Sequence, residues 1–350
     1  MHQFSLLVNS YSKQRIVESQ NSMTMLPVIA VVIPCYRTKP YILSLISQIG
    51  EEVNLIYVVD DACPDNTGSY VQVECADLRV SVIFHSQNQG VGGAVISGYQ
   101  QALRDNATIV VKLDSDGQMN PQLIPKIIHP ILSGRADYAK GNRFFDLKLL
   151  ASMPMLRLVG NTGLSFINKL CTGYWNVMDP TNGYTAIHAQ ILYMIPLHKV
   201  ARRYFFESDM LFRLSTIRAV VCDVPIKAKY DGEVSSLNIS RVILEFPNKY
   251  VVRFLKRIFY NYFLRDFNVG SLELVIGSIL LSMGFIFGLF AWFRSVTSEI
   301  TATSGTVMLA SLPIILGFQS LLAALNYDVG NVPKTPVHGM LVEQLESSET

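Results

Sequence analysis

Four short runs of β-branched and apolar residues constrain the fold of this chain more than any other feature of its sequence. Such runs are typical of buried strands, and they lie at residues 28–33, 55–59, 80–84 and 109–113. Helical spacing of apolar residues follows two of them, at residues 41–49 and 98–103. Strands that alternate with helices in this way form right-handed βαβ units. The sequence therefore predicts an α/β fold, with a mostly parallel sheet flanked by helices.

Polar residues follow each of the four runs. In chain order they are Cys35-Tyr36-Arg37, Asp60-Asp61, the glycine-rich segment 88–93 and Asp114-Ser115-Asp116. The carboxyl ends of parallel strands meet at one edge of a sheet, where open α/β sheets bind ligands. A carboxylate after the second run can accept hydrogen bonds from a nucleobase or ribose, and the glycines let backbone approach a phosphate. The dinucleotide fingerprint is not met, because Val95 takes the place of its third glycine.

Asp114 and Asp116, with Gln118 two residues later, supply hard oxygen ligands. Such ligands suit Mg²⁺ or Mn²⁺, which commonly keep several waters and share the phosphates of a substrate. An acidic turn after a strand has the same spacing, so the motif alone leaves both interpretations open.

Composition narrows the class of protein. Half of the residues are hydrophobic and 16% are charged, against roughly 25% charged in typical soluble domains. The mean hydropathy is +0.29, so we expect part of the chain to meet lipid. The net charge of +2 gives no support for nucleic-acid binding. The five scattered cysteines lack a Cys-x-x-Cys pair, which is typical of free thiols in a reducing compartment and indicates no zinc site.

Residues 1–26 are predicted to be a disordered N-terminal extension. The apolar run at residues 4–8 is too short for the core of a signal peptide. We therefore expect the α/β domain, residues 27–240, to lie in the cytoplasm.

The C-terminal part of the chain contains two long apolar runs of the kind that form transmembrane helices. Residues 271–293 and 306–325 are nearly all apolar, and a helix of about 20 residues crosses the hydrocarbon core. A buried core hairpin is the alternative. Basic residues cluster before the first run, so the positive-inside rule places both the α/β domain and the C-terminal tail in the cytoplasm.

Residues 246–265 carry an apolar stripe that ends at Tyr262, with basic residues displaced from it. This pattern is typical of a helix that lies among lipid headgroups, and packing against the protein's own core is the alternative. The predicted order is juxtamembrane amphipathic helices at 241–268, a two-helix transmembrane hairpin at 269–327 and a cytoplasmic tail at 328–350. Close helix contacts in a homo-oligomer would be allowed by Gln319 and by the small residues Gly277, Ser278, Gly284 and Gly288.

Segments 31–37, 58–67, 88–94 and 112–121, taken together, resemble the family 2 glycosyltransferases, whose fold is called GT-A (Rossmann-like). The segment from Asp114 to Pro121 is similar to the metal motif of polyprenyl-phosphate glycosyltransferases such as the dolichol-phosphate mannose synthases. The resemblance implies an inverting transferase that moves a sugar from a UDP- or GDP-sugar to a polyprenyl phosphate on the cytoplasmic leaflet. It also implies a multi-pass protein of the inner (or ER) membrane that acts in cell-envelope glycan or glycolipid modification.

The resemblance assigns roles to individual residues. Donor-nucleotide contacts are expected at Pro34, Tyr36, Asp60, Asp61, Gly90 and Asp114, metal ligands at Asp116 and Gln118, acceptor-phosphate contacts at Arg143 and Arg157, and sugar or acceptor contacts at Asp179, Glu207, Asp209 and Lys229. Asp114, Asp116 and Arg143 form the expected catalytic set. Some of these have plainer alternatives. Asp60 could cap a turn, Arg143 could be a surface ion-pair partner, and acids such as Glu207 and Asp209 are also expected at a helix N-terminus.

The chain departs from this family at one phosphate contact. Many members carry Arg, Gly and Ser after a later strand, whereas residues 230–237 keep the Gly and Ser but lack the Arg. Lys227 or Lys229 are the expected substitutes.

Two other functions stay open. A processive polysaccharide synthase of the same family usually carries Gln-x-x-Arg-Trp, and neither Trp175 nor Trp292 follows an Arg. The other is a catalytically silent membrane partner of a flippase or of another transferase, which would not need intact Asp114, Asp116 and Gln118. A flippase or downstream transferase is also a candidate partner for an active enzyme.

Overall fold

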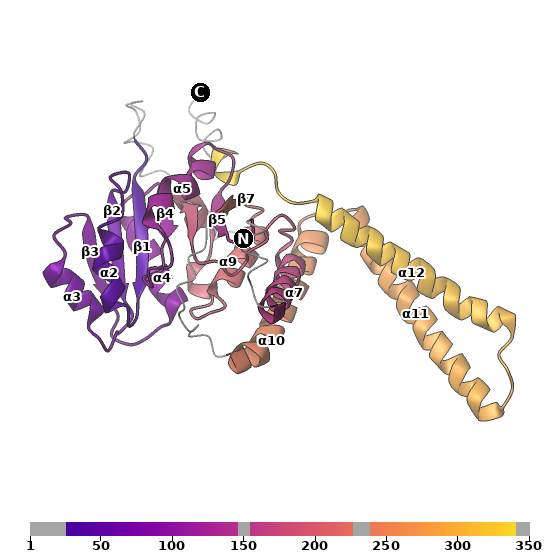
Figure 1. Cartoon of the computed structure of the whole chain (residues 1–350). Helices are drawn as coiled ribbons and strands as arrows, with labels where there is room; N and C mark the ends of the chain where they lie inside the picture. The colour runs from indigo at the N-terminus through magenta and orange to yellow at the C-terminus, as the bar shows by residue number, and fades with distance from the viewer. Residues whose placement is uncertain (1–25, 146–154, 227–238, 341–350) are drawn as a thin grey trace, which may run out of the picture.

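The computed structural model describes residues 26–145, 155–226 and 239–340, so nearly all of the expected N-terminal extension lies outside the described residues. Figure 1 shows an α/β body from which two long helices project as a hairpin. The predicted α/β fold, followed by apolar C-terminal helices, is therefore confirmed.

A seven-stranded sheet forms the centre of the α/β body, in the order β3-β2-β1-β4-β6-β5-β7. Neighbours among β1 to β4 pair in parallel, whereas β6 runs antiparallel to both β4 and β5. The mostly parallel sheet is thus confirmed, with one reversed strand that the sequence did not indicate. The strands are β1 (Ile29–Cys35), β2 (Leu55–Asp60), β3 (Val80–Phe84), β4 (Ile109–Lys112), β5 (Tyr138–Asn142), β6 (Thr185–His188) and β7 (Val221–Pro225).

Helices cover both faces of the sheet, which is why its central strands are mostly apolar. Every residue of β1 and β4 is buried. Side chains alternate between the faces, so Ala30 and Val32 enter one hydrophobic core while Val31 and Ile33 enter the other. The first core is closed by α4 (Val91–Arg104), α8 (Ala189–Met194) and α9 (Phe206–Thr216), and the second by α2 (Lys39–Ile46), α3 (Thr67–Glu74) and α5 (Ile124–Leu132).

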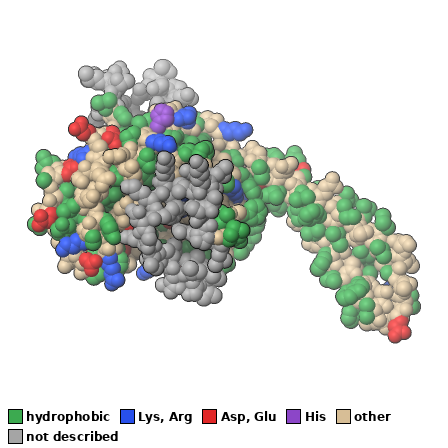
Figure 2. All heavy atoms as spheres, in the orientation of Figure 1, with side chains coloured by type: hydrophobic (Ala, Val, Ile, Leu, Met, Phe, Trp, Pro, Cys, Tyr) green, Lys and Arg blue, Asp and Glu red, His purple; other side chains and the backbone are tan. Residues whose placement is uncertain are grey.

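The helices α11 (Val269–Ser298) and α12 (Ser304–Gly330) form the predicted hairpin. Both are long and apolar enough to cross a bilayer, and little of either is buried inside the molecule. Figure 2 shows hydrophobic side chains along the hairpin, while the charged ones gather on the α/β body. The alternative of a buried core hairpin is therefore wrong.

Glycines let α11 and α12 approach each other closely. A Cβ on Gly317 would lie 2.5 Å from the backbone N of Leu281, and one on Gly284 would lie 2.8 Å from the carbonyl O of Ala310. Two of the small residues that we expected in an oligomer contact, Gly277 and Gly284, are thus buried within the hairpin itself, whereas Ser278 is exposed.

The helix α10 (Ile239–Ile258) joins the α/β body to the hairpin through a π-helical turn, η3 (Phe259–Leu264). Its apolar residues Val251 and Leu255 face outward and are exposed. Arg253 and Arg257 instead pair with carboxylates of the protein. The expectation that the basic side meets lipid headgroups is wrong for these two arginines, because buried carboxylates of the protein attract them. The outward apolar side still suits a bilayer surface.

The expected tail is attached to the α/β body in its described part. The buried carboxylate of Asp137 accepts hydrogen bonds from the amides of Val337 and His338 and from the amide of Val220. His338 Nδ1 lies 2.7 Å from Asp137 Oδ1, and the His338 ring stacks on His188 at 4.4 Å between centroids. The chain therefore returns from the hairpin to the body.

The stacked histidines predict an acid sensitivity. Burial, followed by the nearby His338, lowers the pKa of His188 to about 4. An unfolded chain would bind this proton near pH 6.5, so stability falls as the pH drops through the window from about 6.5 to about 4. We expect the unmodified protein to lose about 1–2 kcal/mol more stability between pH 7 and pH 5 than His188→Asn, which keeps a side-chain acceptor for the helix that follows. Thermal melting in detergent at both pH values measures this, and equal losses would contradict it.

Candidate functional site

A solvent-open cleft of about 700 Å³ lies at the carboxyl end of the parallel strands, as predicted from the sequence. Its volume falls in the range of about 300–1,000 Å³ that is usual for small-molecule sites. Residues at the ends of β1 to β4 and in the loops that follow them line it, together with residues of α4, α7 (Met155–Thr172), α9 and α10. The lining residues are Pro34, Cys35, Tyr36, Asp61, Asn88, Gly90, Val91, Ala94, Lys112, Asp114, Ser115, Asp116, Leu164, Thr181, Arg203, Tyr204, Glu207, Ser208 and Phe246.

The acidic motif after β4 is held in place by hydrogen bonds to its neighbours. The Ser115 hydroxyl donates to the carbonyl O of Pro34 at 2.7 Å, which ties the loops after β4 and β1 together. The Asp116 carboxylate accepts from the Gln118 amide at 3.0 Å across a turn in which Gly117 has φ +77°. Asp114 and Asp116 both line the cleft and Gln118 is exposed beside it.

The residues present fit a hard divalent cation. Two carboxylates and one amide oxygen are the ligand types of Mg²⁺ and Mn²⁺, which bind through one or two carboxylates and complete their coordination with waters and phosphates. Among the described residues, no group of three or more His, Cys, Asp or Glu side chains is arranged to hold a metal without help. A cation here would therefore depend on oxygen atoms of a bound substrate.

Asp61 holds the glycine-rich loop against the cleft. Its carboxylate accepts from the amides of Gln89 and Gly90, at 2.8 and 2.7 Å. The Asp60 carboxylate has different partners. It accepts hydrogen bonds from the backbone amides of Cys63 and Gly68, at 2.7 and 2.6 Å, at the start of α3. Asp60 does not line the cleft, because neighbouring residues of an extended chain point to opposite sides. Asp60 caps a turn, which was the plainer alternative.

Two of the predicted acids lie away from the cleft. Asp179 is fully buried and forms a two-point pair with Arg143, with Nε–Oδ2 at 2.7 Å and Nη2–Oδ1 at 3.0 Å. Asp209 is also fully buried; it accepts from the Ala201 amide and from Arg253 Nε. Neither residue lines the cleft, and both carboxylates hold other parts of the chain. Arg143 is not among the cleft-lining residues.

Three further predicted residues are placed as follows. Glu207 lies at the start of α9 and lines the cleft. Arg157 falls within α7 (Met155–Thr172), but its side chain lies outside the described part of the chain. Lys229, like Lys227, also lies outside the described residues.

Lys112 is a residue of the cleft that the sequence analysis missed. It is the last residue of β4 and is 1% exposed, with Nζ 2.6 Å from Asp114 Oδ1 and 3.2 Å from Glu207 Oε1. Burial would lower the pKa of Lys112, but the two carboxylates outweigh it and raise the pKa above its usual value. A lysine inside an otherwise β-branched strand, two residues before an aspartate, was the available signal.

Gly183 leaves the space in which this ion pair forms. A Cβ on Gly183 would lie 2.2 Å from Asp114 Oδ2 and 2.4 Å from Lys112 Nζ. The turn between Asp179 and β6 therefore shapes the cleft through a missing side chain.

Other unexpected lining residues come from segments distant in sequence. Arg203 and Tyr204 precede α9, Leu164 belongs to α7, and Phe246 belongs to α10. The stem of Arg203 lies over the glycine loop, because a Cβ on Gly90 would meet Arg203 Cγ at 2.9 Å. Nothing in the local sequence places these side chains together.

Removal of the Lys112 charge is predicted to destabilise the protein in a pH-dependent way. In Lys112→Met the Asp114 and Glu207 carboxylates would lose their shared partner, and we expect a loss of about 1–3 kcal/mol at pH 7, less than for a fully buried pair because Asp114 is partly exposed. Part of this loss should be recovered near pH 5, as one carboxylate takes up a proton. Thermal melting measures both effects, with the exposed Lys199→Met as the control. A loss in Lys112→Met that does not change with pH would contradict the explanation.

Comparison with known proteins agrees with this geometry. Residues 30–195 match the model of the glycosyl transferase family 2. The chain is 32% identical to a UDP-N-acetylglucosamine–dolichyl-phosphate N-acetylglucosaminyltransferase of Methanococcus voltae, over 65% of this chain and 96% of that protein. It is 29% identical to an undecaprenyl-phosphate mannosyltransferase of Micrococcus luteus, over 57% of this chain and 82% of that protein.

A solved structure shows the same fold. It is the glucosyl-3-phosphoglycerate synthase of Mycobacterium tuberculosis in complex with Mn²⁺, UDP-glucose and phosphoglyceric acid, with a TM-score of 0.50 and 19% identity, over 66% of this chain and 79% of that one. With its GT-A sheet, its acidic cleft and these relatives, the chain belongs to glycosyltransferase family 2 and resembles the polyprenyl-phosphate glycosyltransferases of that family.

Proposed function

We propose that this protein transfers a sugar from a nucleoside diphosphate sugar to a polyprenyl phosphate at the cytoplasmic leaflet of a membrane. One observation carries the proposal. The helix α10 lines the cleft with Phe246 and continues through η3 into the first apolar helix of the hairpin. The cleft, which we assign to a nucleotide sugar, is thus connected through η3 to helices that could cross a bilayer. A lipid phosphate acceptor would lie in that bilayer, close to the cleft.

The donor side of the reaction uses the residues that follow β1, β2 and β4. Asp61, Pro34 and Tyr36 would contact the nucleotide, and Asp114 would face the sugar diphosphate. Asp116 and Gln118 would hold Mg²⁺ or Mn²⁺. When bound, such a cation stabilises negative charge on the departing nucleoside diphosphate. Lys112 would keep Asp114 and Glu207 in their orientation during the reaction.

The acceptor side needs no strong base, because a phosphate monoester is already ionised at neutral pH. An acceptor phosphate oxygen would form a bond to the anomeric carbon as the bond to the nucleoside diphosphate breaks, with inversion at that carbon. Arg143, oriented by its two-point pair with Asp179, would approach the acceptor phosphate together with Arg157. A guanidinium has five N–H donors and can contact more than one acceptor. Arg143 can therefore bind a phosphate while it stays paired with Asp179.

The attachment of both ends of the hairpin supports a cytoplasmic site. Tyr262, just before α11, and Asp328, near the end of α12, are hydrogen bonded to each other beside the α/β body. Both ends of the hairpin would therefore lie on the same side of the membrane as the cleft. Together with the basic residues that precede α11, this favours the cytoplasmic face of an inner or ER membrane.

Arg203 is the best-placed described cation for the donor diphosphate, in place of the arginine that the family usually supplies. It lines the cleft beside Gly90, and within the described part of the chain no ion pair or hydrogen bond holds its side chain. The neighbouring Arg202 is engaged by Gln89 Oε1 at 3.1 Å and does not line the cleft.

The proposed reaction predicts a metal-dependent glycolipid product. Membranes containing the protein, given radiolabelled UDP- or GDP-sugars, should yield a chloroform-soluble product that mild acid releases. EDTA should abolish it, and Asp116→Ala should lower the rate by at least about 100-fold, since loss of one group that stabilises transition-state charge costs on the order of 10²–10³. A long polymer would instead indicate a polysaccharide synthase. No labelled product with any donor would indicate a silent partner, and full activity of Asp116→Ala would refute the metal assignment.

The role of Arg203 predicts a specific change in nucleotide affinity. Arg203→Met should weaken binding of a nucleoside diphosphate by about tenfold, the effect of one lost charge-assisted hydrogen bond, and should leave binding of the nucleoside unchanged. Arg202→Met is the matched control and should alter neither. Isothermal titration calorimetry with UDP, GDP and their nucleosides measures this. An equal effect of both substitutions would show that the arginines act only through general charge.

A further inference from the structure

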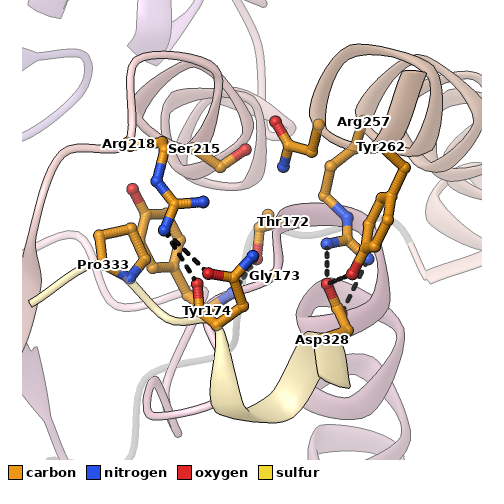
Figure 3. A pocket seen from close by; sticks show the side chains of 11 residues that line it. Thr172, Gly173, Tyr174, Ser215, Arg218, Arg257, Tyr262, Asp328 and Pro333 are labelled. Carbon is orange, nitrogen blue, oxygen red and sulfur yellow. Dashed lines mark hydrogen bonds and ion pairs between the residues drawn. The ribbon is translucent and has the colours of Figure 1, made fainter. Parts of the chain in front are cut away.

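The carboxylate of Asp328, near the end of α12, is the meeting point of three other segments. Arg257 of α10 binds it at two points, with Nη1–Oδ1 at 2.7 Å and Nη2–Oδ2 at 3.1 Å. Tyr262 of η3 donates its hydroxyl to Oδ1 at 2.5 Å, and Trp175, which follows α7, donates Nε1 to Oδ2 at 2.8 Å. Figure 3 shows Arg257 and Tyr262 reaching Asp328 from the same side. We call these four residues the joint.

The joint is an internal connection and not a ligand site. Asp328 is 8% exposed and Arg257 is 2% exposed. The adjoining cavity has a volume of only about 20 Å³, which suits a water molecule and excludes a lipid headgroup or a nucleotide. Gly173, with φ +75°, makes room for the arginine, because a Cβ there would lie 2.7 Å from Arg257 Nη1.

Further contacts beyond α12 fasten the same end of the hairpin. Arg218 Nη2 donates to Asn331 Oδ1 at 3.1 Å, and Figure 3 shows Arg218 beside Pro333 on the returning chain. The tail then reaches Asp137 through Val337 and His338. The α/β body is thus attached to the hairpin twice. It is joined to the start of the hairpin through α10 and η3, and to the end through the chain that follows Asp328.

The joint lies near the C-terminal end of α10, several turns away from the part of this helix that lines the cleft. Phe246 in the cleft and Arg257 in the joint are on the same helix, about 16 Å apart at the rise of an α-helix. A tilt of about 10° at the joint would therefore move the cleft by about 3 Å relative to the hairpin. A misplacement of about 1 Å can cost on the order of 100-fold in rate when two reactants must meet. The angle between the body and the hairpin therefore matters for a reactant that is anchored in the bilayer.

We propose that Asp328 is a positioning residue, which fastens α12 to Arg257, Tyr262 and Trp175 and so holds the cleft at one height and tilt over the membrane. This inference rests on the proposed function, since it concerns the delivery of a lipid acceptor. Asp328 touches neither substrate. Its loss should therefore affect a reaction with a bilayer-anchored acceptor and spare a reaction with an acceptor that diffuses freely in water.

The activity test compares two acceptors with the full-length protein in anionic phospholipid vesicles. With a long-chain polyprenyl phosphate in the bilayer, Asp328→Asn and Arg257→Met should each lower the rate by about tenfold or more. With a short, water-soluble isoprenyl phosphate, both should change it by less than about twofold. The matched control is Asp77→Asn, which removes a similar two-point pair with Arg79 in the α/β body, and it should affect neither acceptor. Equal losses with both acceptors, or no loss with the bilayer acceptor, would overturn the inference. Failure of the unmodified protein with both acceptors would overturn the proposed function itself.

A second measurement needs no activity. Spin labels carried by unnatural amino acids at Ser133 in the body and Ser278 in α11, both exposed, report the distance between the two parts. The distance distribution should be narrow in the otherwise unmodified protein and with Asp77→Asn, and clearly broader with Asp328→Asn. An unchanged narrow distribution with Asp328→Asn would show that the other contacts alone hold the hairpin, and would overturn the inference.

Discussion

Charge that is buried away from water organises this protein, because a buried ion is tolerated only when its hydrogen bonds are satisfied. Asp137, Asp179 and Asp209 are all fully buried, and each binds groups from a distant part of the chain. Asp137 holds the returning tail, Asp179 orients Arg143, and Asp209 ties α9 to α10. Asp328 does the same for the hairpin. These carboxylates help to fix the relative positions of elements that are distant in the sequence.

A buried charge with satisfied partners is also found on the buried side of the cleft. Lys112 is buried at the end of β4 and is surrounded by the acids that face the cleft. Its charge allows Asp114 and Glu207 to approach each other while both remain available at the surface of the cleft. In the proposed reaction, a preorganised arrangement of this kind costs no rearrangement when charge develops on the leaving group.

The helix α10 connects the cleft to the apolar hairpin, and its pattern predicts its orientation only in part. Helical spacing correctly separated an apolar stripe from the basic residues, but spacing does not say which side faces the protein. Val251 and Leu255 of the apolar stripe are exposed, and Arg253 and Arg257 turn inward to pair with carboxylates, whereas Lys256 stays exposed. The free energy of satisfying buried Asp209 and Asp328 decides this, and neither acid is near α10 in sequence.

By itself, the sequence determined the elements and the edge of the sheet at which the site forms. Buried parallel strands need continuous apolar runs and membrane helices need long ones, so β1 to β4 and the hairpin could be recognised, and with them the positions of Asp61, Asp114 and Asp116. Only the tertiary structure decided that β6 is reversed, that Asp60 turns away from Asp61, and that Asp179 and Asp209 serve other residues. It alone brought Lys112, Arg203 and Phe246 to one cleft and Asp328 to Arg257. Contacts between distant segments depend on how the layers pack, and that information is absent from local spacing.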